Sequence, residues 1–93
     1  MIRSFADKRT EEIANGRMPK RFPPDLFVRA QAMLTLLNAA HELSDLRSPP
    51  GNRLEALAGD RAVQHSIRVN RQWRICFRWT DTGVEDVEIV DYH

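Results

Sequence analysis

Apolar residues recur at steps of three and four over one segment in the first half of the chain: Leu26, Ala30, Met33, Leu37 and Ala40. This spacing predicts an amphipathic helix, because residues three and four apart share one helical face. The proline pair at residues 23–24 favours a helix start there, since proline is tolerated in a first helical turn. We therefore expect a helix that packs through this face on a flat surface of the protein.

A shorter helix and a strand are predicted before this one. Asp7 can cap a helix that runs to about Asn15, and Gly16 is well placed to end it. Residues 1–5 alternate between two faces and predict a short opening strand.

The second half of the chain changes to a period of two, which is typical of strands. Residues 64–69 and 73–79 alternate between two faces, residues 85–92 predict a last strand with Val87 and Ile89 toward the core, and turn residues separate these strands at 70–72 and 80–83. Residues 53–57 predict one more short strand, stopped by Gly59 and Asp60. The order predicts an α+β domain over residues 1–93: a twisted, mostly antiparallel sheet with two N-terminal helices packed on one face.

Composition narrows the class of protein. The chain has 93 residues, 42% hydrophobic and 29% charged, as in an ordinary globular domain with a thin core. Cys76 is the one cysteine, so no intramolecular disulfide can form. The longest strongly apolar stretch, near residues 33–40, is too short to cross a bilayer, and the charged N-terminal segment does not resemble a signal peptide. We expect a cytoplasmic protein that binds no membrane.

The net charge is only +1, but charges of opposite sign are segregated. Five arginines and no lysine occupy residues 61–78: Arg61, Arg68, Arg71, Arg74 and Arg78. Five acids and no base follow in residues 81–91: Asp81, Glu85, Asp86, Glu88 and Asp91. Opposite charges on neighbouring strands can pair across a sheet. The arginines can equally form a surface that binds phosphates. The pattern alone leaves both interpretations open.

Standard catalytic and metal-binding motifs are absent, so no metal or cofactor is expected. His65 shares strand parity with Ile67 and Val69, which predicts a packed and hydrogen-bonded core residue. His93 ends the chain, where a histidine commonly has no role because chain ends fray. Its neighbours Asp91 and Tyr92 favour a second interpretation. These three groups suit phosphodiester cleavage in RNA, whose own 2′-OH is the nucleophile, so that an enzyme supplies proton transfer and charge stabilisation.

Several segments together resemble one toxin family. They are residues 1–5 (MIRSF), 49–57 (PPGNRLEAL), 59–61 (GDR), 64–69 (QHSIRV), 72–77 (QWRICF) and 87–93 (VEIVDYH). Over nearly the whole chain, these segments at this spacing resemble the HigB branch of the RelE/ParE superfamily, including plasmid maintenance killer proteins and their GraT-type relatives.

The resemblance implies a RelE-like fold and a metal-free endoribonuclease that cleaves messenger RNA in the ribosomal decoding site. It implies neutralisation by a HigA-type helix-turn-helix antitoxin, whose complex with the toxin represses their operon, so that operator DNA is bound only indirectly. By position, the catalytic carboxylate, tyrosine and histidine fall on Asp91, Tyr92 and His93, and the phosphate-binding strand arginine falls on Arg74. The other arginines expected to bind RNA are Arg53, Arg61, Arg68 and Arg78.

One departure from the family pattern concerns the segment before Gly59. HigB ribonucleases can carry a histidine and then a lysine there, where this chain has Glu55 and Ala58. A carboxylate can act as a general base, so Glu55 joins the candidate catalytic residues. Two alternatives stay open: a gyrase inhibitor, and a weak or non-cleaving toxin that acts as operon co-repressor or binds ribosomes. The terminal Asp-Tyr-His sequence favours the nuclease.

Overall fold

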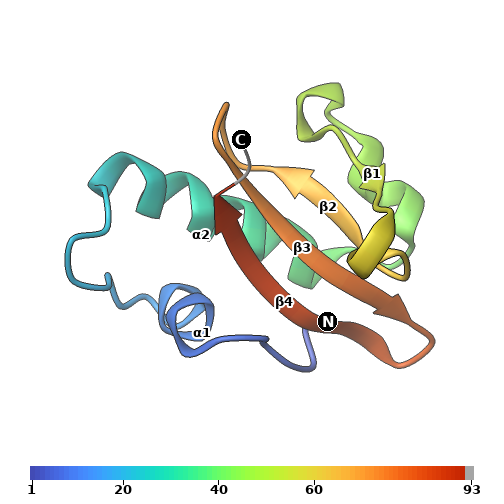
Figure 1. Cartoon of the computed structure of the whole chain (residues 1–93), viewed down its shortest axis with the longest axis horizontal. Helices are drawn as coiled ribbons and strands as arrows, with labels where there is room; N and C mark the ends of the chain where they lie inside the picture. The colour runs from blue at the N-terminus through green and yellow to red at the C-terminus, as the bar shows by residue number, and fades with distance from the viewer. Residues whose placement is uncertain (92–93) are drawn as a thin grey trace.

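A computed structural model of the chain describes residues 1–91. Within these residues it contains two α-helices, α1 (Lys8–Ala14) and α2 (Pro24–Ala39), and four strands, β1 (Glu55–Ala56), β2 (His65–Arg68), β3 (Trp73–Thr80) and β4 (Gly83–Asp91). The strands form one antiparallel sheet in the order β1-β2-β3-β4; α2 packs on one face of this sheet, and α1 lies beside its β4 edge (Figure 1). The predicted α+β class is confirmed.

Helix α1 begins and ends close to where the sequence predicts, and α2 begins where it predicts. The carboxylate of Asp7 accepts a hydrogen bond from the Thr10 backbone N–H at 2.8 Å and thereby caps α1. After α1, Gly16 adopts a left-handed conformation with φ of +87°, which glycine tolerates without the strain of a side chain. Helix α2 starts at Pro24, in the predicted proline pair.

The apolar stripe of α2 packs on the sheet. Its buried residues are Leu26, Ala30, Leu34 and Leu37. Met33, which the sequence stripe included, is only half-buried beside this core, and Leu34 takes the central place. From the sheet, the core receives Ile67, Val69, Ile75, Phe77, Val84, Val87 and Ile89. The predicted core positions Ile67, Ile75, Phe77, Val87 and Ile89 are confirmed, but burial itself does not alternate along β3, where residues 74–77 are all buried.

The predicted opening strand at residues 1–5 is wrong as a continuous element. Only two isolated parallel bridges form with β4, from Ile2 to Val84 and from Phe5 to Val87. Between them Asp86 has a left-handed backbone, with φ of 55°, and the register of β3 and β4 shifts nearby. The N–H of Asp86 donates to the hydroxyl of Ser4 at 2.9 Å instead of to a backbone carbonyl. This bulge interrupts the ladder that a strand would need.

The predicted strand at residues 53–57 is also shorter than expected. It is reduced to β1, Glu55–Ala56, which pairs with β2 at one edge of the sheet. Short 3-10 helices flank it: η1 (Leu43–Arg47), η2 (Pro50–Asn52) and η3 (Gly59–Arg61). Because these turns carry the chain around a short edge strand, the edge offers little backbone for pairing with another chain. No helix among residues 1–91 is long and apolar enough to span a membrane.

Helix α1 covers the opposite edge of the sheet. The hydroxyl of Thr10 is buried and accepts a hydrogen bond from the Ile89 N–H at 3.0 Å, and the Arg9 guanidinium donates to the Ile89 carbonyl at 3.1 Å. These two contacts satisfy backbone groups of β4 that have no strand partner on that side. A side-chain pair therefore joins the first helix to the last strand.

Replacing Thr10 by valine should weaken this junction. Valine has nearly the same shape but no acceptor, so the buried Ile89 N–H loses its partner. We expect Thr10→Val to lower the free energy of unfolding by about 1–3 kcal/mol, measured by denaturant titration. Hydrogen exchange at the Ile89 amide should become faster in Thr10→Val and stay slow in Thr10→Ser, which keeps the hydroxyl. Unchanged protection of this amide in the valine variant would contradict the assignment.

Candidate functional site

Four arginines, one acid and one amide line a pocket of about 370 Å³ at the β2–β3 end of the sheet: Arg53, Glu55, Arg68, Asn70, Arg71 and Arg74. Arg68 on β2 and Arg74 on β3 are direct cross-strand partners. Two like charges in such positions destabilise a sheet. An arrangement of this kind gains stability when an anion binds between the cations.

The guanidinium of Arg74 is fixed by the surrounding chain. Its Nε donates to Ser66 Oγ at 2.7 Å, and its Nη2 donates to the carbonyls of Ser66, at 3.3 Å, and of Arg53. The Arg74 side chain is only 10% exposed. Arginine carries five N–H groups, so these contacts occupy three and leave the two on Nη1, which has no hydrogen-bond partner among residues 1–91. One fixed amino group thus remains for a ligand.

Arg53 contributes both its backbone and its side chain. Its backbone lies in the left-handed region, with φ of 46° and ψ of 59°, directly after η2. A residue with a Cβ is strained in this conformation, and such strain is concentrated at functional sites. The carbonyl accepts from Arg74, while the side chain lines the pocket.

Glu55 lies at the margin of the pocket, opposite Ser66 in the register of β1 and β2. Its side chain is 55% exposed, and its Oε1 is 3.9 Å from Arg74 Nη1. This distance makes an ion pair but is too long for a hydrogen bond. The carboxylate is therefore close to the free amino group without occupying it. Ala58 is exposed at the start of η3 and does not line the pocket.

The arginines of the sequence block separate into two groups. Arg61 pairs with Glu88 at 3.1 Å, and Arg78 pairs with Glu85 at 2.7 Å and with Asp86 at 3.3 Å. These arginines do not line the pocket, so their role as RNA contacts stays a prediction. For them, pairing across the sheet explains the charge segregation. The guanidinium groups of Arg53 and Arg71 have no acidic partner within residues 1–91.

Asp91 is the last residue that the structure describes. It pairs with Trp73 at the start of β3, and its carboxylate accepts from Gln72 Nε2 at 3.0 Å. Because Gln72 follows Arg71 in the β2–β3 hairpin, β4 ends beside the segment that lines the pocket (Figure 1). The predicted catalytic residues Tyr92 and His93 lie outside the described residues.

Two further titratable residues are placed by packing. The ring of His65 stacks on Phe77, with centroids 6.3 Å apart, which confirms that it packs. The prediction that His65 is hydrogen-bonded is wrong for its Nδ1, because this buried atom has no partner within residues 1–91.

Burial raises the pKa of the Cys76 thiol, so little thiolate forms near neutral pH. Cys76 is a poor candidate nucleophile.

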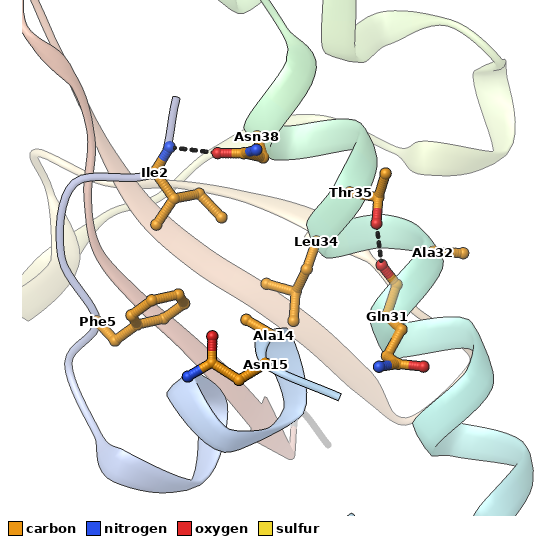
Figure 2. A pocket seen from close by; sticks show the side chains of 9 residues that line it. All are labelled: Ile2, Phe5, Ala14, Asn15, Gln31, Ala32, Leu34, Thr35 and Asn38. Atoms are coloured by element: carbon orange, nitrogen blue, oxygen red, sulfur yellow. Dashed lines mark hydrogen bonds between the residues drawn. The ribbon is translucent and has the colours of Figure 1, made fainter. Parts of the chain in front are cut away.

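A second pocket, of about 480 Å³, lies between α1, α2 and the N-terminal segment (Figure 2). Three of its polar side chains bond within the fold: Asn38 Oδ1 accepts from the Ile2 N–H at 2.8 Å, Thr35 Oγ1 donates to the Gln31 carbonyl at 2.9 Å (Figure 2), and Gln31 Nε2 donates to the Ile13 carbonyl at 3.2 Å. None of the side chains that line it is titratable. This pocket offers no group for acid–base chemistry or for binding a phosphate by charge.

Sequence reasoning identified Arg53, Glu55, Arg68 and Arg74, and the structure brings all four together. It did not assign Asn70 and Arg71, which also line the pocket, or Ser66, which does not line it but binds Arg74. A weak signal was present, because Ser66, Arg68 and Arg74 occupy the polar side of the predicted strands. The left-handed backbone of Arg53 had no sequence signal.

The chain is similar to one described toxin family and to two bacterial proteins. The model of a family described as "RelE-like toxin of type II toxin-antitoxin system HigB" matches residues 3–93. Toxin HigB-1 of Vibrio cholerae serotype O1 is 42% identical over 94 aligned residues, which cover 100% of this chain and 98% of that protein. An uncharacterized protein of Haemophilus influenzae is 32% identical over 72 residues, covering 77% of this chain and 71% of that protein.

Arg53 allows a direct test of the backbone geometry. Glycine adopts the left-handed conformation without strain, whereas alanine keeps a Cβ. We expect the free energy of unfolding of Arg53→Gly to exceed that of Arg53→Ala by about 1 kcal/mol in denaturant titration. Both variants remove the same charge, so the difference between them reports the backbone conformation alone. Equal stability of the two variants, or a more stable alanine variant, would show that residue 53 is not left-handed.

Proposed function

The chain belongs to the HigB-like family of RelE-like toxins of type II toxin–antitoxin systems, and we propose that it is a ribosome-dependent endoribonuclease that cleaves messenger RNA. The observation that supports this proposal is the arginine pocket, which Arg74 lines with a guanidinium that is fixed through Nε and Nη2 and makes no hydrogen bond through Nη1 within residues 1–91. The proposal includes a HigA-type antitoxin as the partner that neutralises the toxin and binds operator DNA, and the cytoplasm as the place of action.

The pocket fits the chemistry at a scissile phosphate. Negative charge grows on the non-bridging oxygens as the 2′-OH of RNA attacks phosphorus. Donors that are already aimed at these oxygens stabilise the transition state without reorganising. Arg74 supplies such a donor, and Arg53, Arg68 and Arg71 add positive charge around it. The arginines thereby supply the electrostatic part of catalysis.

Proton transfer requires two further groups. Glu55 is the proposed base: it takes the proton from the 2′-OH, whose oxygen then bonds to phosphorus and forms a 2′,3′-cyclic phosphate. As the bond from phosphorus to O5′ breaks, His93 is the proposed acid that protonates O5′. Tyr92 is proposed to bind the phosphate or stack on a base, and Asp91 to orient its neighbours. For Asp91, Tyr92 and His93, this assignment is based on the family resemblance.

The arginine pocket favours this function over inhibition of gyrase by protein contact. A protein contact surface needs no gathered, unneutralised cations. Here Arg68 and Arg74 face each other across two strands, and the single acid in the pocket approaches only one of them. Such an arrangement is suited to a polyanionic ligand that enters between them.

Substitution of Arg74 tests the proposal. We expect Arg74→Ala to slow cleavage of ribosome-bound message about a hundredfold, because it removes a preorganised charge worth about 3 kcal/mol in the transition state. Arg71→Ala should have a smaller effect, since hydrogen bonds fix the Arg74 guanidinium and none within residues 1–91 fixes that of Arg71. Cleavage is measured by primer extension, and the growth of cells that express each variant without the antitoxin is measured in parallel.

Arg17→Ala is the matched control, because it removes an exposed arginine from the loop between the helices. It should cleave as the unaltered protein does. Circular dichroism establishes that each variant is folded. If the unaltered toxin arrests growth while messages stay intact, the proposed ribonuclease function is rejected. If Arg17→Ala and Arg74→Ala lower the cleavage rate equally, the total charge matters and the position of Arg74 does not.

A further inference from the structure

We propose that Ser66 is a positioning residue that aims Nη1 of Arg74 at the scissile phosphate and holds Arg74 apart from Glu55. The inference depends on the proposed ribonuclease function and assigns a role within the same site. Ser66 itself does not line the arginine pocket. It acts through Arg74, which does.

The contacts of Ser66 determine the direction of the guanidinium group. Ser66 is fully buried on β2 and gives Arg74 two acceptors, its Oγ to Nε at 2.7 Å and its carbonyl to Nη2 at 3.3 Å. A guanidinium is planar and rigid, so fixing Nε and Nη2 also fixes where Nη1 points. The carbonyl of Arg53 adds a third fixed contact on Nη2.

The sheet register places Ser66 at the centre of this arrangement. Arg68, not Ser66, is the direct cross-strand partner of Arg74, so the Arg74 side chain reaches diagonally to Ser66. On the other side of β2, Glu55 is the direct partner of Ser66. Ser66 therefore lies between the strand that carries the proposed base and the strand that carries the phosphate-binding arginine.

The separation of Arg74 and Glu55 follows from these contacts. Glu55 Oε1 is 3.9 Å from Nη1, about 1 Å longer than a charged hydrogen bond. A guanidinium released from Ser66 can turn toward this carboxylate and form a bidentate pair. Such a pair would occupy both the donor meant for the phosphate and the carboxylate meant for the 2′-OH proton. Ser66 thus keeps the site open.

A double-mutant cycle tests this role. We expect Ser66→Ala to lower the maximal single-turnover rate of cleavage on ribosomes about tenfold or more, since a hydrogen bond to a charged group is lost. The toxin concentration that gives half the maximal rate should change little. Ser66→Thr, which keeps the hydroxyl, should retain most of the rate. In an Arg74→Ala background, Ser66→Ala should cause no further loss.

Each outcome separates the inference from the function on which it depends. No cleavage by the unaltered toxin rejects the proposed function. Cleavage by the unaltered toxin and by Ser66→Ala at equal rates overturns the positioning role. An equal fold-loss from Ser66→Ala with and without Arg74 also overturns it, because a purely structural effect does not depend on that arginine. If Ser66→Ala does not fold, Ser66→Cys, which has nearly the same shape and a weaker acceptor, is measured with the same expectations.

Discussion

The arrangement of the site depends on the hydrogen bonds that hold the buried guanidinium of Arg74. A charge removed from water is costly unless hydrogen bonds and counter-charges compensate it. Here the compensation comes from Ser66 on β2 and from the carbonyl of Arg53 before β1. These acceptors reach Arg74 only when β1, β2 and β3 pair in their observed register and Arg53 is left-handed. One side chain thereby couples the edge of the sheet to the proposed chemistry.

Much of the fold could be predicted, because apolar periodicity and turn residues are local properties of the sequence. The stripe of α2 and the alternation of β2, β3 and β4 required no knowledge of distant contacts. The prediction of a continuous strand at residues 1–5 was wrong because that strand depends on Asp86, more than 80 residues away. The left-handed backbone of Asp86 interrupts the hydrogen-bond ladder with β4. The placement of Leu34 ahead of Met33 depends likewise on how α2 is rotated against the sheet.

The site could be predicted as a set of residue types but not as a geometry. Arg53, Glu55, Arg68 and Arg74 lie together because strand pairing brings their segments side by side. Arg61 and Arg78 belong to the same sequence block, yet acids on β4 pair with them. No sequence pattern distinguishes these two groups, since the difference depends on register. The same holds for Ser66, whose diagonal contact with Arg74 exists only in the folded sheet.

We propose that this protein supplies charge stabilisation and proton transfer to an attack by the RNA's own 2′-OH. The most direct measurement is the chemistry of the cut ends, made on a defined message on ribosomes with the purified toxin. We predict a 2′,3′-cyclic phosphate and a 5′-hydroxyl at each cut, and no cut where a single 2′-deoxy nucleotide replaces the one before the scissile phosphate. Ends with a 5′-phosphate, or cleavage of the deoxy-substituted message, would contradict the claim, because both require a nucleophile other than the 2′-OH.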